Sequence, residues 1–236
     1  MPSFLEAARS QVGRKFLTGI TGFLILFFVF IHLAGNLTIF GEAEAMNRYS
    51  MKLHDFGWLL WVARAGLAVA FGLHAWIGLS IWWRRRKARP DGYEVYSSRG
   101  GPSKQGLSSR SMAFTGTVLL LFLILHLNTF AFGETETVLV DSYETHDIKT
   151  LVIDTFQNPL YAFGYAFVMV LLGTHLGHGV WSAATSLTMK NHKVSAVVYT
   201  LGVVIAVALA VGFLFIPLYI YFTGGCGPLI AGTNCS

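Results

Sequence analysis

Five long apolar runs take up most of this 236-residue chain. A transmembrane helix needs about 20 predominantly apolar residues to cross the hydrocarbon core of a bilayer. The runs therefore predict an all-α integral membrane protein, a bundle of five transmembrane helices that forms a single domain over residues 1–236. The predicted spans are 16–40, 57–83, 112–133, 159–187 and 195–223.

The composition excludes other classes of protein. Only 12% of the residues are charged, whereas soluble domains have about 25%. Hydrophobic residues make up 54% of the chain, which excludes intrinsic disorder. Five spans also leave no room for a soluble catalytic domain in the connections. The apolar part of the first run is longer than the h-region of a signal peptide, so we expect this run to be retained.

Basic residues are concentrated in alternate connections. Of the 17 Lys and Arg residues, 13 lie in the N-terminal segment, the second connection and the fourth connection. The first and third connections carry mainly Asp and Glu. By the positive-inside rule, the N-terminus faces the cytoplasm and the C-terminus lies outside. We therefore expect a multi-pass protein of the bacterial cytoplasmic (inner) membrane.

The strongest basic run, Arg84–Lys87, directly follows the second span. Such a run can indicate nucleic-acid binding, but after a span it is typical of an anchor that touches anionic lipid. It is also compatible with a docking surface for a cytoplasmic partner. Residues 90–110 are rich in Gly, Ser and charged residues, which predicts a loop. No internal repeat is evident, and the sequence leaves open whether Cys226 and Cys235 form a disulfide in the outer compartment.

Five of the eight histidines fall inside spans, and they are distributed over the first four spans. Ionisable residues within a membrane are energetically costly and are candidates for a function. His32 and His126 lie about four residues outside the midplane, whereas His74, His175 and His178 lie on its cytoplasmic side, so the two layers are about 10 Å apart. Two imidazoles at the same depth on two helices are what bis-histidine ligation of a haem requires. The sequence therefore predicts two haems, an outer one on His32 and His126 and an inner one on His74 and a histidine of the fourth span.

Two histidines of the fourth span compete for the inner haem. We favour His175, because Gly179 follows it by four residues just as Gly78 follows His74, and glycine lets a flat group approach the helix closely. His178 is then an alternative ligand or a contact to a haem propionate. The chain has no C-x-x-C-H sequence, so both haems are expected to be non-covalent and b-type.

Four local patterns extend this interpretation. They are Thr18-Gly-Ile-Thr-Gly22 leading to His32-Leu-Ala-Gly-Asn36, His74-Ala-Trp-Ile-Gly78, His126-Leu-Asn-Thr-Phe130, and His175-Leu-Gly-His-Gly-Val-Trp-Ser182. Together with the five spans they resemble the diheme cytochrome b membrane anchor of succinate dehydrogenase and fumarate reductase (complex II), over essentially the whole chain. In that family the first and third spans bind the haem distal to the soluble subunits, and the second and fourth spans bind the proximal haem.

The resemblance implies a role in electron transport. The anchor of this family binds an iron–sulfur subunit, which carries a flavoprotein subunit, and electrons from succinate reach a quinone. This chain would then contain no site that oxidises succinate. It would instead bind the quinone and be the place of its reduction, and menaquinone is the preferred quinone. The family places the quinone near the outer haem. There the first outer connection offers Tyr49, His54 and Asp55 to bind or protonate a quinone oxygen, and the alternative is that these are solvated loop residues.

Two other functions remain open at the level of the sequence. A diheme cytochrome b of a hydrogenase or formate dehydrogenase has the same chemistry and a different partner. A transporter or channel that uses intramembrane histidines for a metal or for protons would often carry carboxylates beside them, and the spans contain almost none.

Overall fold

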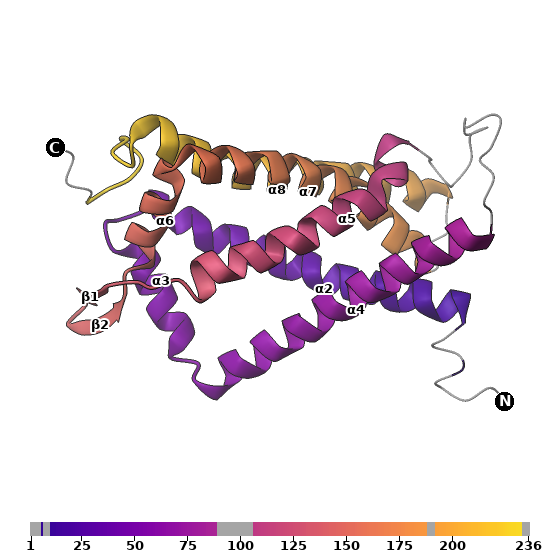
Figure 1. The fold of residues 1–236 in the computed structure, drawn as a ribbon, viewed down its shortest axis with the longest axis horizontal. Helices are drawn as coiled ribbons and strands as arrows, with labels where there is room; N and C mark the ends of the chain where they lie inside the picture. The colour runs from indigo at the N-terminus through magenta and orange to yellow at the C-terminus, as the bar shows by residue number, and fades with distance from the viewer. Residues whose placement is uncertain (1–5, 7–9, 89–105, 188–191, 233–236) are drawn as a thin grey trace. The chain divides into compact units, whose positions relative to one another are not determined.

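The computed structural model describes residues 6, 10–88, 106–187 and 192–232. Five long helices dominate it (Figure 1). They are α2 (Gln11–Leu37), α4 (Trp58–Ala88), α5 (Leu107–His126), α7 (Pro159–Ser186) and α8 (His192–Thr223). A short 3-10 helix, η1 (Thr38–Phe40), extends α2, and a π-helical turn, η2 (Leu127–Ala131), extends α5.

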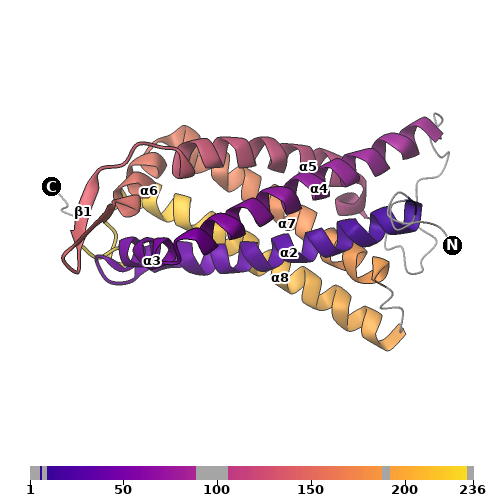
Figure 2. The ribbon, with the colours of Figure 1, turned by 90° about the horizontal axis from the view of Figure 1, so that it is seen from below.

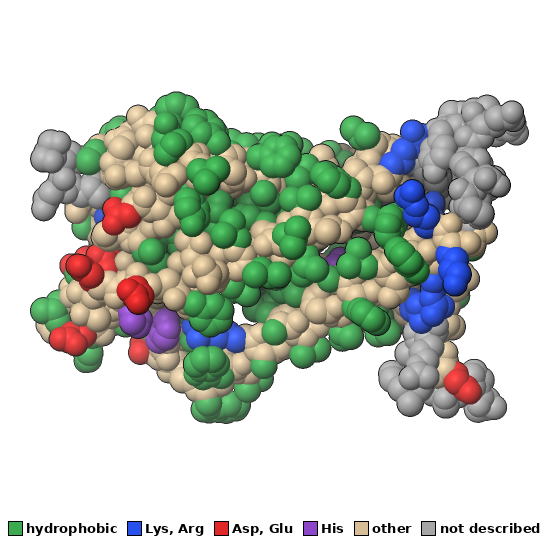
Figure 3. All heavy atoms as spheres, viewed as in Figure 1, with side chains coloured by type: hydrophobic (Ala, Val, Ile, Leu, Met, Phe, Trp, Pro, Cys, Tyr) green, Lys and Arg blue, Asp and Glu red, His purple; other side chains and the backbone are tan. Residues whose placement is uncertain are grey.

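All five helices are long and apolar enough to cross a membrane. The expected spans are confirmed, since each coincides with one of these helices to within a few residues. Large apolar side chains are exposed along all of them and cover much of the visible surface (Figure 3). Exposed apolar surface on this scale suits contact with lipid rather than water.

The connections between the long helices contain secondary structure that was not predicted from the sequence. They form α3 (Ala45–His54), the hairpin β1 (Thr137–Val140) and β2 (Tyr143–His146), and α6 (Ile148–Gln157). The strands are antiparallel and pair Thr137 with His146. The hairpin turns at Asp141 and Ser142, both with positive φ, as a tight two-residue hairpin turn requires. The helix α3 contacts both β2 and α6 (Figure 2).

The chain divides into two compact units, which we describe separately. The first unit comprises Met1–Phe27, Leu67–Leu120 and Leu171–Val207, and the second comprises Phe28–Gly66, Leu121–Val170 and Ala208–Ser236. All five long helices contribute residues to both units.

Close helix contacts hold the first unit together. A Cβ on Gly19 would lie 3.5 Å from the Ala183 carbonyl oxygen, and a Cβ on Gly202 would lie 3.0 Å from a methyl group of Val180. Such small residues let transmembrane helices approach closely, which replaces the hydrophobic driving force that is absent in lipid. Trp181 is buried in this unit and meets the ring of Tyr199 at 5.9 Å.

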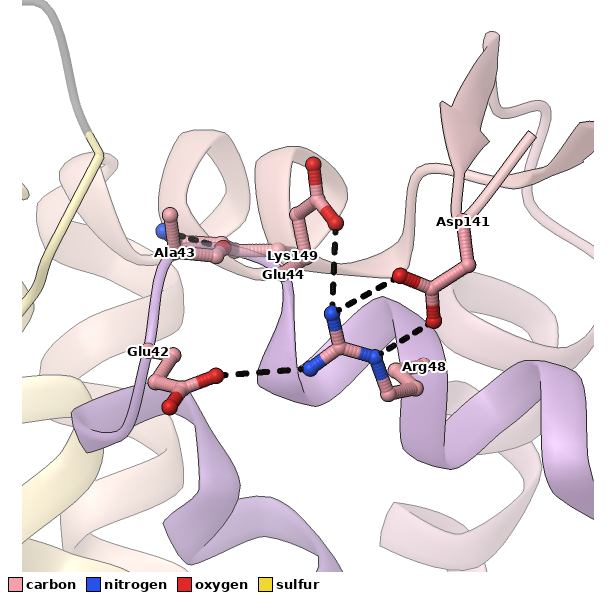
Figure 4. A network of polar contacts seen from close by, with 6 residues as sticks. All are labelled: Glu42, Ala43, Glu44, Arg48, Asp141 and Lys149. Carbon is pink, nitrogen blue, oxygen red and sulfur yellow. Dashed lines mark hydrogen bonds and ion pairs between the residues drawn. The ribbon is translucent and has the colours of Figure 1, made fainter. Parts of the chain in front are cut away.

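A polar network links the connections of the second unit (Figure 4). Arg48 of α3 donates to Asp141 at 2.8 Å and pairs with Glu42 and Glu44 at 3.4 and 3.5 Å. The hydrogen bond from Arg48 lowers the pKa of the Asp141 carboxyl. The buried Lys149 donates through Nζ to the carbonyl oxygens of Ala43, at 3.0 Å, and of Ala231. The network therefore ties α6 to the first connection and to the C-terminal tail.

A second set of hydrogen bonds joins α3 to α6. The buried Asn47 donates to the Asp147 carboxylate at 2.8 Å and accepts the backbone N–H of Lys149 at 3.0 Å. Asp147 caps α6 by accepting from the Thr150 amide at 3.1 Å. Burial raises the pKa of Asp147, but the hydrogen bonds from Asn47 and Thr150 outweigh it, so that its pKa lies below the ordinary value. Cys226 is disulfide-bonded, and the other cysteine of the chain, Cys235, lies outside the described residues.

Candidate functional site

The first unit brings together one histidine from each of two helices. His74 of α4 and His175 of α7 lie with their ring centroids 6.4 Å apart and their planes at 70°. Both side chains are half-buried. His178 lies nearly one turn further along α7 and is also half-buried.

Two threonines from neighbouring helices contact this pair. The hydroxyl of Thr115, on α5, lies 3.0 Å from His175 Nδ1. The hydroxyl of Thr21, on α2, lies 3.3 Å from His74 Nδ1. Both threonines are buried. Each of these two histidines is thus contacted at Nδ1 by a hydroxyl from another helix.

A glycine follows each of these threonines and lies against the same ring. A Cβ on Gly22 would lie 3.2 Å from His74 Cε1, and a Cβ on Gly116 would lie 3.2 Å from His175 Cε1. Any larger residue would press on the imidazole. By contrast, a Cβ on Gly78 or Gly179 would meet no atom of the described residues within 4 Å. The glycines that follow the two histidines by four residues therefore border open space.

The second unit holds another histidine pair. His32 of α2 and His126 of α5 have ring centroids 5.6 Å apart and planes at 89°. Aromatic rings surround the pair, at centroid distances of 5.3 to 6.1 Å. They are Phe28 and Phe213 beside His32, and Phe122, Phe130 and Tyr165 beside His126. The α-helix ends at His126 and continues as the π-helical turn η2, a distortion that is frequent at functional sites.

The polar surroundings of this second pair differ from those of the first. The side-chain amide of Asn36 lies 3.3 Å from His32 Nε2 and also donates to the His32 carbonyl at 2.8 Å. Among the described residues, the buried His126 Nδ1 has no hydrogen-bond partner. Buried polar atoms rarely lack a partner, so this nitrogen is available to a further group at this site.

Each pair could offer two imidazole nitrogens to a haem iron. A metal lies about 2 Å from a ligating imidazole nitrogen, so two such rings on opposite sides of one ion have centroids about 6 Å apart. The separation of 6.4 Å in the first unit is close to this value, and that of 5.6 Å in the second unit is shorter. Both separations also lie in the range of ordinary edge-to-face ring pairs. No group of three or more His, Cys, Asp or Glu in the described part of the chain could hold a metal ion. A haem iron, held by four porphyrin nitrogens, needs only two protein ligands.

The three residues considered for quinone binding occupy different surroundings in the second unit. Tyr49 of α3 packs against α2, where a Cβ on Gly35 would lie 2.5 Å from its ring. Gly35 comes three residues after His32. His54 and Asp55 are exposed at the end of α3, and His54 Nδ1 lies 2.9 Å from the Ser50 carbonyl oxygen. Of the three, Tyr49 alone packs against the helix that carries His32.

The two Thr–Gly pairs were not predicted as site residues, although they occur in a recurring pattern of the sequence. Thr21-Gly22 stands eleven residues before His32-Leu33, and Thr115-Gly116 stands eleven residues before His126-Leu127. A second pattern, Gly-x-His-x-x-x-Gly, occurs around His74 and again around His175. The same two local patterns thus occur twice, once in α2 and α4 and once in α5 and α7.

Comparison with protein-family models, with curated proteins and with solved structures finds no match for this chain.

Proposed function

We propose that this chain is the membrane-anchor and electron-transfer subunit of a succinate:quinone oxidoreductase, with two b-type haems held by His32 with His126 and by His74 with His175. The observation that carries the proposal is the pairing itself. Four histidines, each from a different helix, form two pairs with ring centroids 5.6 and 6.4 Å apart, which supports two sites of two imidazoles each. Haem bound there would supply one-electron transfer within the membrane.

The chain's own residues would bind, orient and shield the two cofactors. The four histidines would hold the two haem irons, and the aromatic rings around His32 and His126 would exclude water from the outer site. The open space beside Gly78 and Gly179 is suited to a flat macrocycle next to His74 and His175. His178 would contact the edge of the inner haem.

The charges support the proposed partners and orientation. In the first unit, Arg84, Arg85, Arg86 and Lys87 end α4 in a basic cluster (Figure 3, blue). We assign this end to the cytoplasm of a bacterium, by the positive-inside rule. There it would contact anionic lipid and the iron–sulfur subunit, which carries the flavoprotein subunit.

The second unit would provide the quinone site near the outer haem. Tyr49 is the preferred contact because it packs against α2 close to His32. Its hydroxyl can donate a hydrogen bond to a quinone oxygen. Menaquinone is the proposed quinone.

The test is an optical difference spectrum, dithionite-reduced minus oxidised, of the purified protein, with haem quantified per chain. Two low-spin b haems per chain are expected. His32→Ala and His74→Ala should each remove one haem, and His146→Ala, at an exposed position of β2, serves as the matched control that retains both. Absence of haem from the unsubstituted protein would overturn the proposal. Co-purification of a flavoprotein, rather than a nickel or molybdenum subunit, separates complex II from a hydrogenase or formate dehydrogenase.

A further inference from the structure

We propose that Thr21 and Thr115 are positioning residues that fix the tautomer of the inner histidines and lower the reduction potential of the haem they hold. This inference rests on the proposed function. It assigns a role to two residues that bind no cofactor themselves and act through His74 and His175.

Each threonine hydroxyl already donates that proton within its own helix. Thr115 Oγ1 lies 3.0 Å from the Ser111 carbonyl oxygen, and Thr21 Oγ1 lies 2.8 Å from that of Leu17. A hydroxyl has one proton to donate and two lone pairs that accept. Toward the histidine, therefore, the hydroxyl oxygen accepts, and the imidazole Nδ1–H donates.

The direction of this hydrogen bond determines which nitrogen can bind iron. A neutral imidazole carries one proton, so a proton on Nδ1 leaves the lone pair on Nε2. His74 and His175 are both set in this tautomer, with Nε2 available as the ligand. An acceptor on Nδ1–H also makes a ligating imidazole more basic. A more basic ligand stabilises ferric over ferrous iron and so lowers the reduction potential.

A contact between the hydroxyl and a histidine is not a general property of the threonines in these helices. Thr117 of α5 and Thr18 of α2 also donate to the carbonyl four residues before them, both at 2.8 Å. This bond is the usual one for a threonine inside a helix. Thr21 and Thr115 differ because the hydroxyl of each, at the same position of the recurring Thr-Gly pattern, also meets a histidine of another helix.

The test is a redox titration of both haems in the purified complex, followed by optical spectroscopy. The inner haem is identified as the one that is absent from the His74→Ala variant. In Thr115→Val the Nδ1–H of His175 loses its acceptor, and the midpoint potential of the inner haem should rise. We expect a change of about tenfold in the ferric-to-ferrous equilibrium, which is about 59 mV for a one-electron couple. Thr21→Val should give a smaller shift in the same direction, because its contact is longer and the backbone carbonyl of Thr18 also accepts from His74.

Two controls separate tuning from simple structural damage. Thr115→Ser keeps the hydroxyl and should restore the original potential, and Thr117→Val should leave both haems unchanged. If Thr115→Val lowers the yield of haem, the more distant Thr21 contact still provides the measurement. Two haems of unaltered potential in both valine variants would overturn the inference and leave the proposed function intact. Absence of haem from the unsubstituted complex would overturn both.

Discussion

At the scale of single residues, each histidine of the first unit is contacted by a threonine and a glycine of another helix. The Thr–Gly pairs of α2 and α5 approach the Nδ1–Cε1 edge of His74 and His175 with a hydroxyl and a bare backbone. Glycine is required here by the close approach of the ring rather than by backbone conformation. The hydroxyl contact and the close backbone approach can be tested separately, because the threonine provides the first and the glycine provides the second.

Substituting Gly116 by Ala should displace the His175 ring. The added Cβ would lie 3.2 Å from Cε1, which is closer than an ordinary van der Waals contact, so the imidazole must move by a few tenths of an ångström. Small displacements of a metal ligand weaken binding by about 10- to 100-fold, and we expect loss of the inner haem, measured as haem per chain. The control is Gly72→Ala on α4, where a Cβ meets no described atom within 4 Å. If Gly116→Ala retains both haems at full occupancy, the close approach has no functional importance.

At the scale of elements, the spans could be predicted and the connections could not. A run of apolar residues long enough to cross a bilayer constrains the structure locally, so each span needed only its own sequence. The helices α3 and α6 have ten residues each, a length that is marginal for an isolated helix in water. They are held by contacts between distant residues, such as Asn47 with Lys149. The histidine pairs could be proposed because the depth of each histidine in the membrane follows from its own span. Thr21 and Thr115 were missed because their contacts join different helices.

Asn47→Ala should loosen α6 from α3. The substitution removes the acceptor of the buried Lys149 N–H and the donor to Asp147. Leaving one buried polar group without its partner costs about 1–3 kcal/mol. We expect a lower midpoint of thermal unfolding and faster proteolysis within the second unit, with Lys52→Ala, an exposed position on α3, as the control. Equal stability of both variants would show that this contact contributes nothing.

The stabilisation given by the Asp147 carboxylate should also depend on pH. Its pKa lies below the ordinary value of 3.8 in the folded protein, so the folded state favours the charged form. This contribution is fully present above the unfolded pKa and is lost as the pH falls through the lower folded pKa. The difference in stability between the unsubstituted protein and Asn47→Ala should therefore be constant near neutral pH and shrink below about pH 3.8. A difference that stays constant into acid would contradict a role for the carboxylate.

At the scale of the whole molecule, each of the two units has its own histidine pair, and the charged residues differ in sign between alternate connections. Under the proposed function, the basic ends face the cytoplasm and the soluble subunits. An electron from succinate then enters on the cytoplasmic side and moves outward, toward the positive side of the membrane. Quinone reduction near the outer face would take its protons from outside.

This arrangement couples succinate oxidation to the membrane potential. One charge that crosses 100 mV gains about 2.3 kcal/mol, which helps to drive reduction of a low-potential quinone such as menaquinone. Collapsing the potential in intact cells should therefore slow succinate oxidation. An artificial acceptor that takes electrons directly from the soluble subunits serves as the control, because that route does not cross the membrane and should be insensitive. Faster or unchanged oxidation by the quinone route would reverse the proposed orientation or place quinone reduction on the cytoplasmic side.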